Sequence, residues 1–294
     1  MPILSIMRRC ARLVLVLTVT LTACAGPQSG PTTTTPASVL GAVPATIIRP
    51  DGPGPFPAVV IMHDCSGLGP RSSGAPDRWA KELTRRGYFV MMPDSFTPRG
   101  VPDGVCVAGP ARGIDVSPER RARDAYAALE QLRQRPDVDG RRVGLMGGSH
   151  GGSTTLAAMR ASGTDTGEGF AAAVALYPRC ATFRGIVYRP LAPLLILIGD
   201  KDDWTPADEC RKLAEAAAGA GHPVALKIYP GAHHSFDSPN PVRYVATRIN
   251  PSVPGGRGAT TGGHPEAWAD SIQQVAAFFG RHLAVVPSRA QENR

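Results

Sequence analysis

A serine between glycines follows a short apolar segment near the middle of the chain. Residues 147–151 read Gly-Gly-Ser-His-Gly, after an apolar run at 143–146 and before a helix-like stretch at 153–160. This pattern is typical of a nucleophile elbow, a sharp strand-to-helix turn that holds a serine hydroxyl clear of the backbone. A glycine-rich connection without a catalytic role has the same letters, but the flanking strand and helix favour Ser149 as a nucleophile.

An acidic cluster and a pair of histidines come later in the chain, each just past an apolar run. Residues 194–198 lead to a glycine and then to aspartates at 200, 202 and 203, and residues 224–229 lead to histidines at 233 and 234. A serine hydroxyl needs an imidazole to take its proton, and that imidazole needs a carboxylate to hold its tautomer. Because Ser, then Asp, then His is the chain order of α/β-hydrolases, the sequence predicts a Ser-Asp-His triad.

Four segments together resemble the dienelactone hydrolase family of α/β-hydrolases. They are residues 61–68, 93–96, 199–206 and 229–236, and the resemblance spans residues 45–283. It implies Asp202 as the triad acid, because the family's acid stands three residues after a strand-ending glycine, with a proline four residues further on. It implies His234 rather than His233 as the triad histidine, since His234 precedes Ser-Phe after a Pro-Gly-Ala turn. One departure is that the namesake enzymes carry cysteine where this chain has Ser149.

Negative charge that develops on a substrate oxygen during attack needs two fixed hydrogen-bond donors. The N–H of His150, directly after the nucleophile, is the first expected donor, and the resemblance implies the N–H of Cys65 as the second. Asp64 stands where relatives carry an acid near the site, but a turn carboxylate that bonds neighbouring N–H groups fits it equally. Trp204, close to the predicted acid, either lines the pocket or packs against the start of a helix.

The first residues predict an exported protein. Three arginines precede an apolar run at 13–21 that is too short to span a bilayer, and the run leads into Leu-Thr-Ala-Cys at 21–24. This ending resembles a bacterial lipobox, which implies a signal peptide at 1–23 and acylation of Cys24. The alternative is an ordinary signal peptide cut near residue 23 or 25. We expect a protein anchored by lipid to a bacterial membrane and facing the periplasm or the cell surface.

The rest of the chain predicts one domain between two flexible ends. Residues 24–40, rich in Thr, Pro and Ser, are expected to form an extended tether, residues 41–285 the hydrolase domain, and residues 286–294 a disordered tail. The formal net charge is +8, but the arginines that supply most of it are scattered. Because they form no basic stripe, no nucleic-acid partner is expected.

Four cysteines remain in the expected mature domain, namely Cys65, Cys106, Cys180 and Cys210. An even number in an oxidising compartment predicts disulfides. We expect Cys65 to pair with Cys106 and Cys180 with Cys210, because each pair joins loops at the same edge of the predicted sheet. Free buried thiols are the alternative. Neither C-x-x-C nor H-E-x-x-H spacing occurs, so we expect no metal site, and the triad chemistry needs no cofactor.

Strand-like and helix-like segments alternate along the chain. This alternation predicts an α/β-hydrolase fold, a doubly wound and mainly parallel sheet flanked by helices, with the site at its carboxyl edge. Only a loop fits at 178–190, so no large cap domain is expected, and the polar stretch at 237–263 either covers the site or lies elsewhere. Ser117-Pro118 and Thr205-Pro206 predict two helix starts. The expected strands are at 46–49, 58–62, 88–92, 142–146, 171–176, 194–198 and 224–229, and the expected helices at 76–86, 118–135, 151–161, 206–220 and 265–282.

Together these features predict a serine hydrolase that cleaves carboxylic esters or lactones of small-molecule substrates. A peptidase of the prolyl-oligopeptidase kind is an alternative with the same fold and triad, but this chain lacks a propeller-sized N-terminal domain. A non-catalytic surface binding protein is the second alternative, and the complete set of triad residues argues against it.

Overall fold

Eight strands form one sheet that is mainly parallel. The computed structural model describes residues 33–35, 43–161 and 169–284. In the strand order β1-β2-β4-β3-β5-β6-β7-β8, all pairs from β4 to β8 run parallel, while β1 and β2 join the β4 edge in antiparallel fashion. The strands are β1 (Thr33–Thr35), β2 (Ala45–Ile48), β3 (Phe56–Met62), β4 (Phe89–Pro93), β5 (Val138–Gly148), β6 (Ala172–Leu176), β7 (Leu194–Gly199) and β8 (Ala225–Tyr229).

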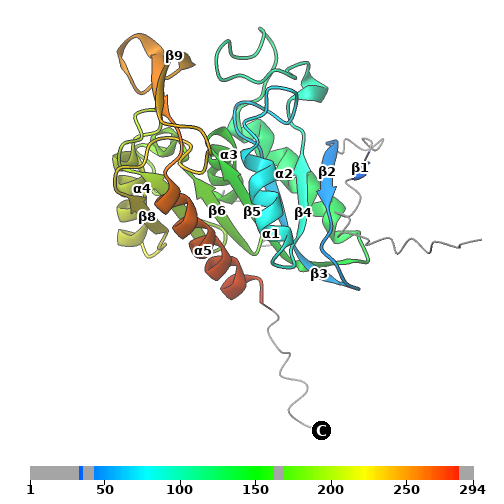
Figure 1. Cartoon of the computed structure of the whole chain (residues 1–294). Helices are drawn as coiled ribbons and strands as arrows, with labels where there is room; N and C mark the ends of the chain where they lie inside the picture. Colours follow the sequence, from blue (N-terminus) through cyan, green and yellow to red (C-terminus); the bar gives the residue numbers. More distant parts are fainter. Residues whose placement is uncertain (1–32, 36–42, 162–168, 285–294) are drawn as a thin grey trace, which may run out of the picture.

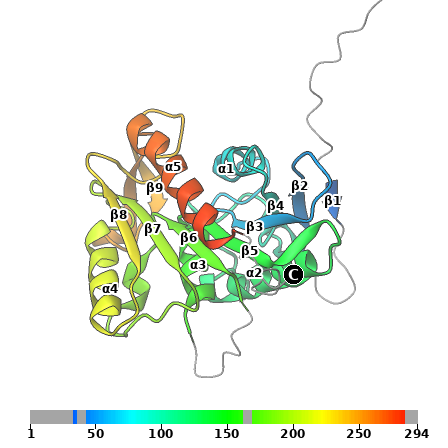
Figure 2. The ribbon, with the colours of Figure 1, turned by 90° about the horizontal axis from the view of Figure 1, so that it is seen from below.

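Helices cover both faces of this sheet, which confirms the predicted doubly wound arrangement. α1 and α5 lie on one face and α2 and α3 on the other, while α4 packs beside β7 and β8 (Figure 2). The rings of Trp79 and Trp268 meet at a centroid distance of 4.7 Å and join α1 to α5. The helices are α1 (Ala75–Thr84), α2 (Pro118–Arg133), α3 (His150–Met159), α4 (Ala207–Gly219) and α5 (Pro265–His282).

The central strands are buried because helices shield both of their faces. Every residue of β4, β6 and β7 is buried, and such strands read as continuous apolar runs in a sequence. The carboxyl ends of parallel strands meet at one edge of a sheet. The segments that follow β3, β5, β7 and β8 therefore gather there, and they carry Cys65, Ser149, Asp202 and His234.

Local sequence sets where the helices begin. The Ser117 hydroxyl accepts the N–H of Arg120 at 3.2 Å and Pro118 takes the first helical position, so α2 begins as predicted. The second prediction was wrong in one detail. Pro206 rather than Thr205 occupies the N-cap of α4, because the Thr205 hydroxyl is engaged by other groups at the sheet edge.

Thr33–Thr35 form an edge strand inside the segment that was expected to be tether. β1 pairs antiparallel with β2 in the register Thr34 to Thr46. Threonine is β-branched and favours extended backbone, and the outer edge of β2 offers free ladder groups. The predicted signal peptide at 1–23, the acylation site Cys24 and the tail at 286–294 lie outside the described residues. Within the described residues, no helix is long and apolar enough to span a bilayer.

A two-stranded hairpin rises above the carboxyl edge of the main sheet (Figure 1). It consists of β9 (Arg243–Ile249) and β10 (Arg257–Thr261), which pair antiparallel within the long polar stretch that follows His234. The buried Asn250 secures the turn, because its side-chain amide donates to the carbonyl oxygens of Asp203 at 3.0 Å and Gly258 at 2.7 Å. The stretch at 237–263 is thus a structured arm held against the loop after β7.

Both disulfides form with the predicted partners. Cys65 is bonded to Cys106, and Cys180 is bonded to Cys210. The first bond joins the loop after β3 to the loop that precedes α2, and the N–H of Ile249 in β9 then donates to the carbonyl of Cys106 at 3.0 Å. The loop after β3 and the hairpin are therefore connected through one covalent and one hydrogen-bonded link.

Candidate active site

Ser149 is the single residue between β5 and α3. Its backbone has φ 55° and ψ −114°, a region that residues with a side chain rarely adopt. A side chain at Gly151 would overlap the carbonyl oxygen of Met62, and a side chain at Gly147 would overlap the backbone of Gly151. The glycines thus let strand and helix approach closely, and the strained turn presents the Ser149 hydroxyl at the start of α3, which is the geometry of a nucleophile elbow.

Ser149, His234 and Asp202 form a chain of hydrogen bonds. The Ser149 Oγ lies 2.9 Å from Nε2 of His234, and Nδ1 of His234 lies 2.8 Å from Oδ2 of Asp202. His234 is 1% exposed and Asp202 4% exposed. Because a carboxylate only accepts, Nδ1 carries the ring hydrogen and donates it to Asp202, which leaves Nε2 free to accept the serine proton.

The Asp202 carboxylate is held by four donors. Its Oδ1 accepts the N–H groups of Trp204 at 3.0 Å and Thr205 at 2.8 Å. Its Oδ2 accepts from His234 and lies 2.9 Å from the Thr205 hydroxyl, which is also 3.1 Å from the carbonyl oxygen of Tyr177. These contacts fix the plane of the carboxylate. Sequence reasoning missed Thr205 here, because a threonine before a proline also fits a helix cap.

The neighbouring Asp200 and Asp203 hold two other segments of the backbone in place. Oδ1 of Asp200 accepts the N–H of Gly231 at 2.7 Å and so closes the turn that precedes His234. Asp203 accepts the N–H of Thr260 at 2.8 Å and the hydroxyl of Thr260 at 2.7 Å, which ties the hairpin to the loop after β7. We find no hydrogen bond between either carboxylate and His234 in the described part of the chain.

The two backbone groups predicted to bind an oxyanion are free to donate. Neither the N–H of Cys65 nor that of His150 has a hydrogen-bond acceptor among the described residues. His150 directly follows Ser149 in the chain, and Cys65 lines the same cavity as Ser149. Unoccupied, fixed donors next to a nucleophile are what a developing oxyanion requires, so their assignment stays a prediction that this geometry supports.

Ser149 and His234 open into a polar cavity of about 280 Å³. Asp64 lines this cavity, and its carboxylate accepts the N–H of Ser66 at 2.7 Å and the hydroxyls of Ser66 and Ser73. It therefore fits both expectations, as a pocket residue and as a turn carboxylate. The cavity is lined by Asp64, Cys65, Ser66, Arg71, Ser72, Ser73, Ala75, Arg78, Cys106, Ser149, Trp204, His234, Ser235, Asp237, Ser238, Asn240, Arg243, Arg248, Thr261 and Gly262.

Trp204 lines the cavity and also fixes the hairpin. Its ring lies 4.7 Å from the ring of His234, and its Nε1–H donates to the carbonyl of Ile249 at 2.8 Å. The Arg248 guanidinium lies 5.4 Å from a ring centroid of Trp204. The indole thus lies close to both His234 and an arginine of the hairpin.

A buried network behind His234 was not visible in the sequence. Asp237 accepts the Tyr177 hydroxyl at 2.8 Å and the Trp79 Nε1–H at 2.8 Å, and the Tyr177 ring lies 4.8 Å from the ring of His234. Burial raises the pKa of Asp237 above its usual range and raises the pKa of Tyr177 well above its own. Because these residues come from three distant segments, no local pattern could have brought them together.

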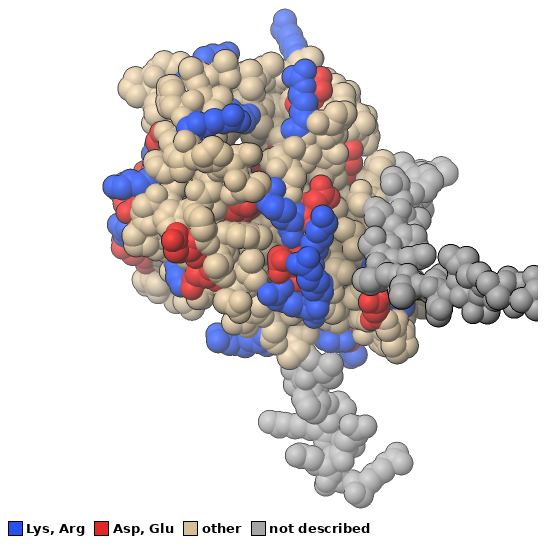
Figure 3. Space-filling model, viewed as in Figure 1, with Lys and Arg blue, Asp and Glu red and all other residues tan. Residues whose placement is uncertain are grey.

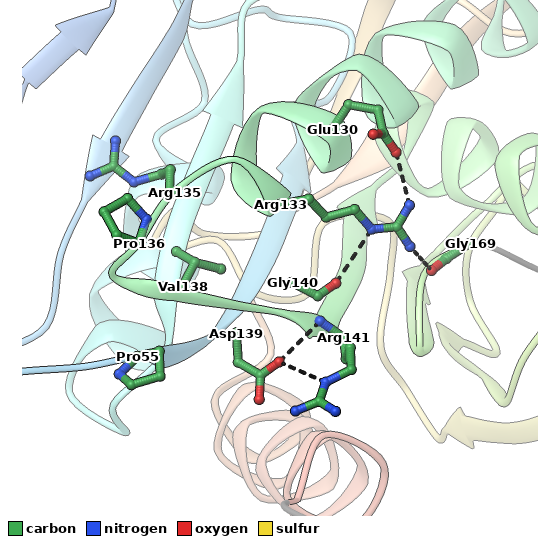
Figure 4. Close-up of a pocket in the computed structure, with 10 residues that line it drawn as sticks. All are labelled: Pro55, Glu130, Arg133, Arg135, Pro136, Val138, Asp139, Gly140, Arg141 and Gly169. Carbon is green, nitrogen blue, oxygen red and sulfur yellow. Dashed lines mark hydrogen bonds and ion pairs between the residues drawn. The ribbon is translucent and has the colours of Figure 1, made fainter.

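A larger cavity, of about 790 Å³, lies at the opposite end of the sheet, near the start of β5 (Figure 4). Its charged groups are already satisfied: Arg133 bonds Glu130 and the carbonyls of Gly140 and Gly169, and Arg141 pairs with Asp139. None of Ser149, His234 and Asp202 lines this cavity. Among the described residues, no group of three or more potential ligands could hold a metal ion.

Comparison with known proteins places the chain in a family. A sequence profile of the dienelactone hydrolase family matches residues 43–283. The chain belongs to this family. This dienelactone hydrolase family member is 25% identical over 197 residues to a Bradyrhizobium protein assigned as a 2-oxo-3-(5-oxofuran-2-ylidene)propanoate lactonase, with 65% of this chain and 78% of the relative covered. It is 24% identical over 205 residues to a Methylorubrum extorquens protein assigned as a carboxymethylenebutenolidase, with 67% and 68% covered.

Solved structures confirm the α/β-hydrolase fold of this family member. A crystal structure from Klebsiella pneumoniae, assigned as a dienelactone hydrolase, superposes with a TM-score of 0.62 at 20% identity, covering 85% of this chain and 98% of that one. A thermophilic esterase of Thermogutta terrifontis with bound propionate superposes with a TM-score of 0.59 at 16% identity, covering 90% and 98%. By family, the chain is a hydrolase of the ester and lactone class.

Proposed function

We propose that this protein hydrolyses carboxylic esters or lactones of small molecules through a serine acyl-enzyme. The observation that carries the proposal is the hydrogen-bonded chain from Ser149 through His234 to Asp202, with distances of 2.9 Å and 2.8 Å. It opens into a cavity of a size that suits a small substrate. The prolyl-oligopeptidase and binding-protein alternatives have no comparable observation in their favour.

The geometry supports a two-step reaction. The Ser149 oxygen bonds to the substrate carbonyl carbon while its proton passes to Nε2 of His234, and Asp202 stabilises the imidazolium that results. The N–H groups of Cys65 and His150 hold the oxyanion. The tetrahedral intermediate collapses, and the leaving oxygen departs with the proton from His234. Water then attacks the acyl-enzyme by the same route and frees the acid.

A fluorophosphonate probe tests the proposal directly. We expect one covalent adduct per chain, mapped to the peptide that contains Ser149, with hydrolysis of p-nitrophenyl esters and lactones blocked in proportion to labelling. A peptide amide assayed in parallel distinguishes the peptidase alternative, which predicts that the amide is cleaved as well as the ester, whereas an esterase or lactonase should leave the amide intact. Active enzyme that takes up no label would contradict a serine mechanism.

The cavity further supports a substrate that carries a negative charge. Basic and acidic side chains are interspersed on the face of the molecule seen in Figure 3. In α1, for example, Glu82 pairs with Arg85 and Arg86 at 2.7 Å. Arg243 and Arg248 line the cavity from the hairpin, and no described acid forms an ion pair with either. The buried Nε of Arg248 has no hydrogen-bond acceptor in the described chain. A bound carboxylate would satisfy these donors.

Replacing Arg248 by methionine tests the anionic substrate. For a lactone or ester that carries a carboxylate, we expect KM to rise about tenfold or more, since a hydrogen bond to a charged group contributes about 1.5–3 kcal/mol. KM for a neutral ester of equal size should stay the same. Arg71 also lines the cavity but is paired with Asp103 at 3.3 Å, so Arg71→Met is the matched control. Equal KM changes for charged and neutral substrates would argue against an anion subsite.

We also propose that the protein is exported and anchored to a membrane through Cys24, on the strength of the Leu-Thr-Ala-Cys string at 21–24. The full-length protein should partition with membranes, and Cys24→Ser should release it into the soluble fraction. Fractionation of cells that express each form, followed by mass spectrometry of the mature N-terminus, measures this. If both forms appear in the soluble fraction to the same extent, the proposed lipid anchor is refuted.

A further inference from the structure

Arg121 is a fully buried arginine beneath the active site, with 0% of its surface exposed. It projects from α2, and its guanidinium lies 4.8 Å from the ring centroid of Phe96. No carboxylate among the described residues lies within ion-pair distance of it, and its Nε has no hydrogen-bond acceptor. A buried cation without a paired acid is costly, so its contacts call for an explanation beyond packing.

The guanidinium reaches two chain segments at once. Its Nη1 lies 2.6 Å from Nδ1 of His150, and its Nη2 donates to the carbonyl oxygen of His63 at 2.7 Å. Because guanidinium nitrogens only donate, Nδ1 of His150 must be the unprotonated, accepting nitrogen. His63 precedes Cys65 by two residues. Arg121 is thus bonded to the segments that carry both free N–H groups of the predicted oxyanion hole.

The tautomer of His63 makes the second contact unambiguous. Its Nε2 faces the N–H of Ser95 at 3.2 Å and must accept, so its Nδ1 carries the hydrogen and donates to the carbonyl of Asp64 at 2.9 Å. The Nη2 of Arg121, although 3.1 Å from that Nδ1, therefore bonds only the backbone oxygen of His63. Arg121 therefore bonds the backbone carbonyl of His63 in one segment and the imidazole of His150 in the other.

Charge and burial agree with this arrangement. Burial lowers the pKa of Arg121 to about 9, so the group still carries its charge at neutral pH. Burial, followed by the charge of Arg121, lowers the pKa of His150 to about 3 and that of His63 well below its usual range. Both imidazoles are therefore neutral, and each is held in one tautomer. Arg121 is the positive group among the three side chains.

We propose that Arg121 is a positioning residue that sets the spacing of the two oxyanion-hole donors by bonding His150 and the backbone of His63 with one rigid guanidinium. This inference rests on the proposed serine mechanism. A planar fork with fixed angles suits that role better than lysine's flexible chain and single nitrogen. The positive charge also lies next to the residue whose N–H would hold the negative oxygen, so it favours the oxyanion over the neutral carbonyl.

Arg121→Lys is the informative variant, because it keeps the charge and removes the fork. We expect kcat for a p-nitrophenyl ester to fall about 10²-fold with KM little changed, since small misplacement of catalytic groups has effects of that size. A trifluoromethyl ketone gives the second readout. Ser149 adds to its carbonyl carbon, the serine proton passes to His234, and the oxygen becomes an anion in the hole. Its affinity should fall in parallel with kcat/KM, whereas affinity for the product acid should not.

Arg99→Lys is the matched control. Arg99 is a second arginine packed against α2, and its guanidinium bonds the Asp124 carboxylate at 2.7 Å and 2.8 Å without touching His63 or His150. If Arg121 only stabilises the fold, both variants should lower the melting temperature and leave kcat and ketone affinity of the folded enzyme unchanged. That result for Arg121→Lys would overturn the proposal.

A second variant covers the case in which Arg121→Lys does not fold. His150→Ala removes the side chain that Arg121 bonds but keeps the backbone N–H, and it should lower kcat and ketone affinity at constant KM. An unchanged kcat in His150→Ala would also overturn the proposal. Fluorophosphonate labelling of the wild type distinguishes failure of the serine mechanism from failure of the role of Arg121. If Ser149 is not labelled, the serine mechanism itself is refuted. If Ser149 is labelled but Arg121→Lys keeps full activity, only the role of Arg121 is refuted.

Discussion

Ser149→Ala should abolish ester and lactone hydrolysis, with a fall in kcat of about 10⁶, the size found when a triad nucleophile is removed. The physical reason is that no other hydroxyl lies within hydrogen-bond distance of Nε2 of His234 in the described chain. Turnover is measured with a p-nitrophenyl ester, and circular dichroism checks that the fold is kept. Labelling by a fluorophosphonate should disappear together with activity.

Ser153→Ala provides the matched control for this experiment. Ser153 lies one helical turn further along α3, and its hydroxyl donates to the carbonyl of Ser149 at 3.1 Å and accepts the N–H of Arg179 at 3.0 Å. Losing these bonds should affect stability while leaving the nucleophile in place. Undiminished turnover in Ser149→Ala, or loss of labelling only in Ser153→Ala, would be incompatible with the proposed mechanism.

The parts of the fold that could be predicted are those set by local pattern. The apolar runs of β6 and β7 predicted two strands, and the alternation of strands with helices predicted a mainly parallel sheet; the structure buries both strands completely. Because parallel strands end at the same edge, the polar residues that follow them could be expected to converge. The structure brings Ser149, His234 and Asp202 together in that way.

The hairpin could not be predicted because it lacks the pattern of a buried strand. Every residue of β9 is exposed or half-exposed, so neither alternation nor a continuous apolar run marks it. What holds it in place are single polar contacts from elsewhere in the chain, such as Asp203 with Thr260 and Trp204 with Ile249. Such long-range pairs leave no periodic trace in a sequence.

Arg121 shows the same difficulty at a single residue. In the sequence it belongs to a basic run on a predicted helix, which is usually a solvated face, yet the structure buries it completely. The acceptors that make this burial possible are His150 and the carbonyl of His63, on two other elements. The position of Arg121 along α2 sets the direction in which its side chain points. Its hydrogen-bond partners depend on how the other elements pack against α2.

Asp202→Asn should lower kcat by about 10⁴ with the fold intact, the size found when an orienting triad carboxylate becomes an amide. The N–H groups of Trp204 and Thr205 both point at Oδ1, so the amide oxygen must take that position and the amide nitrogen must face His234. That nitrogen then donates to Nδ1 and forces the hydrogen of His234 onto Nε2. An Nε2–H can no longer accept the proton of Ser149.

The neighbouring acids make matched controls, because their contacts tolerate an amide. The oxygen of an asparagine at position 200 can still accept the N–H of Gly231, and one at position 203 can still accept the N–H of Thr260. Asp200→Asn and Asp203→Asn should therefore retain most activity at a melting temperature equal to that of Asp202→Asn. Steady-state kinetics of the three variants with one ester decide the matter. If either neighbour proves costlier than Asp202, the carboxylate that orients His234 in catalysis has been misassigned, despite its 2.8 Å contact with that ring.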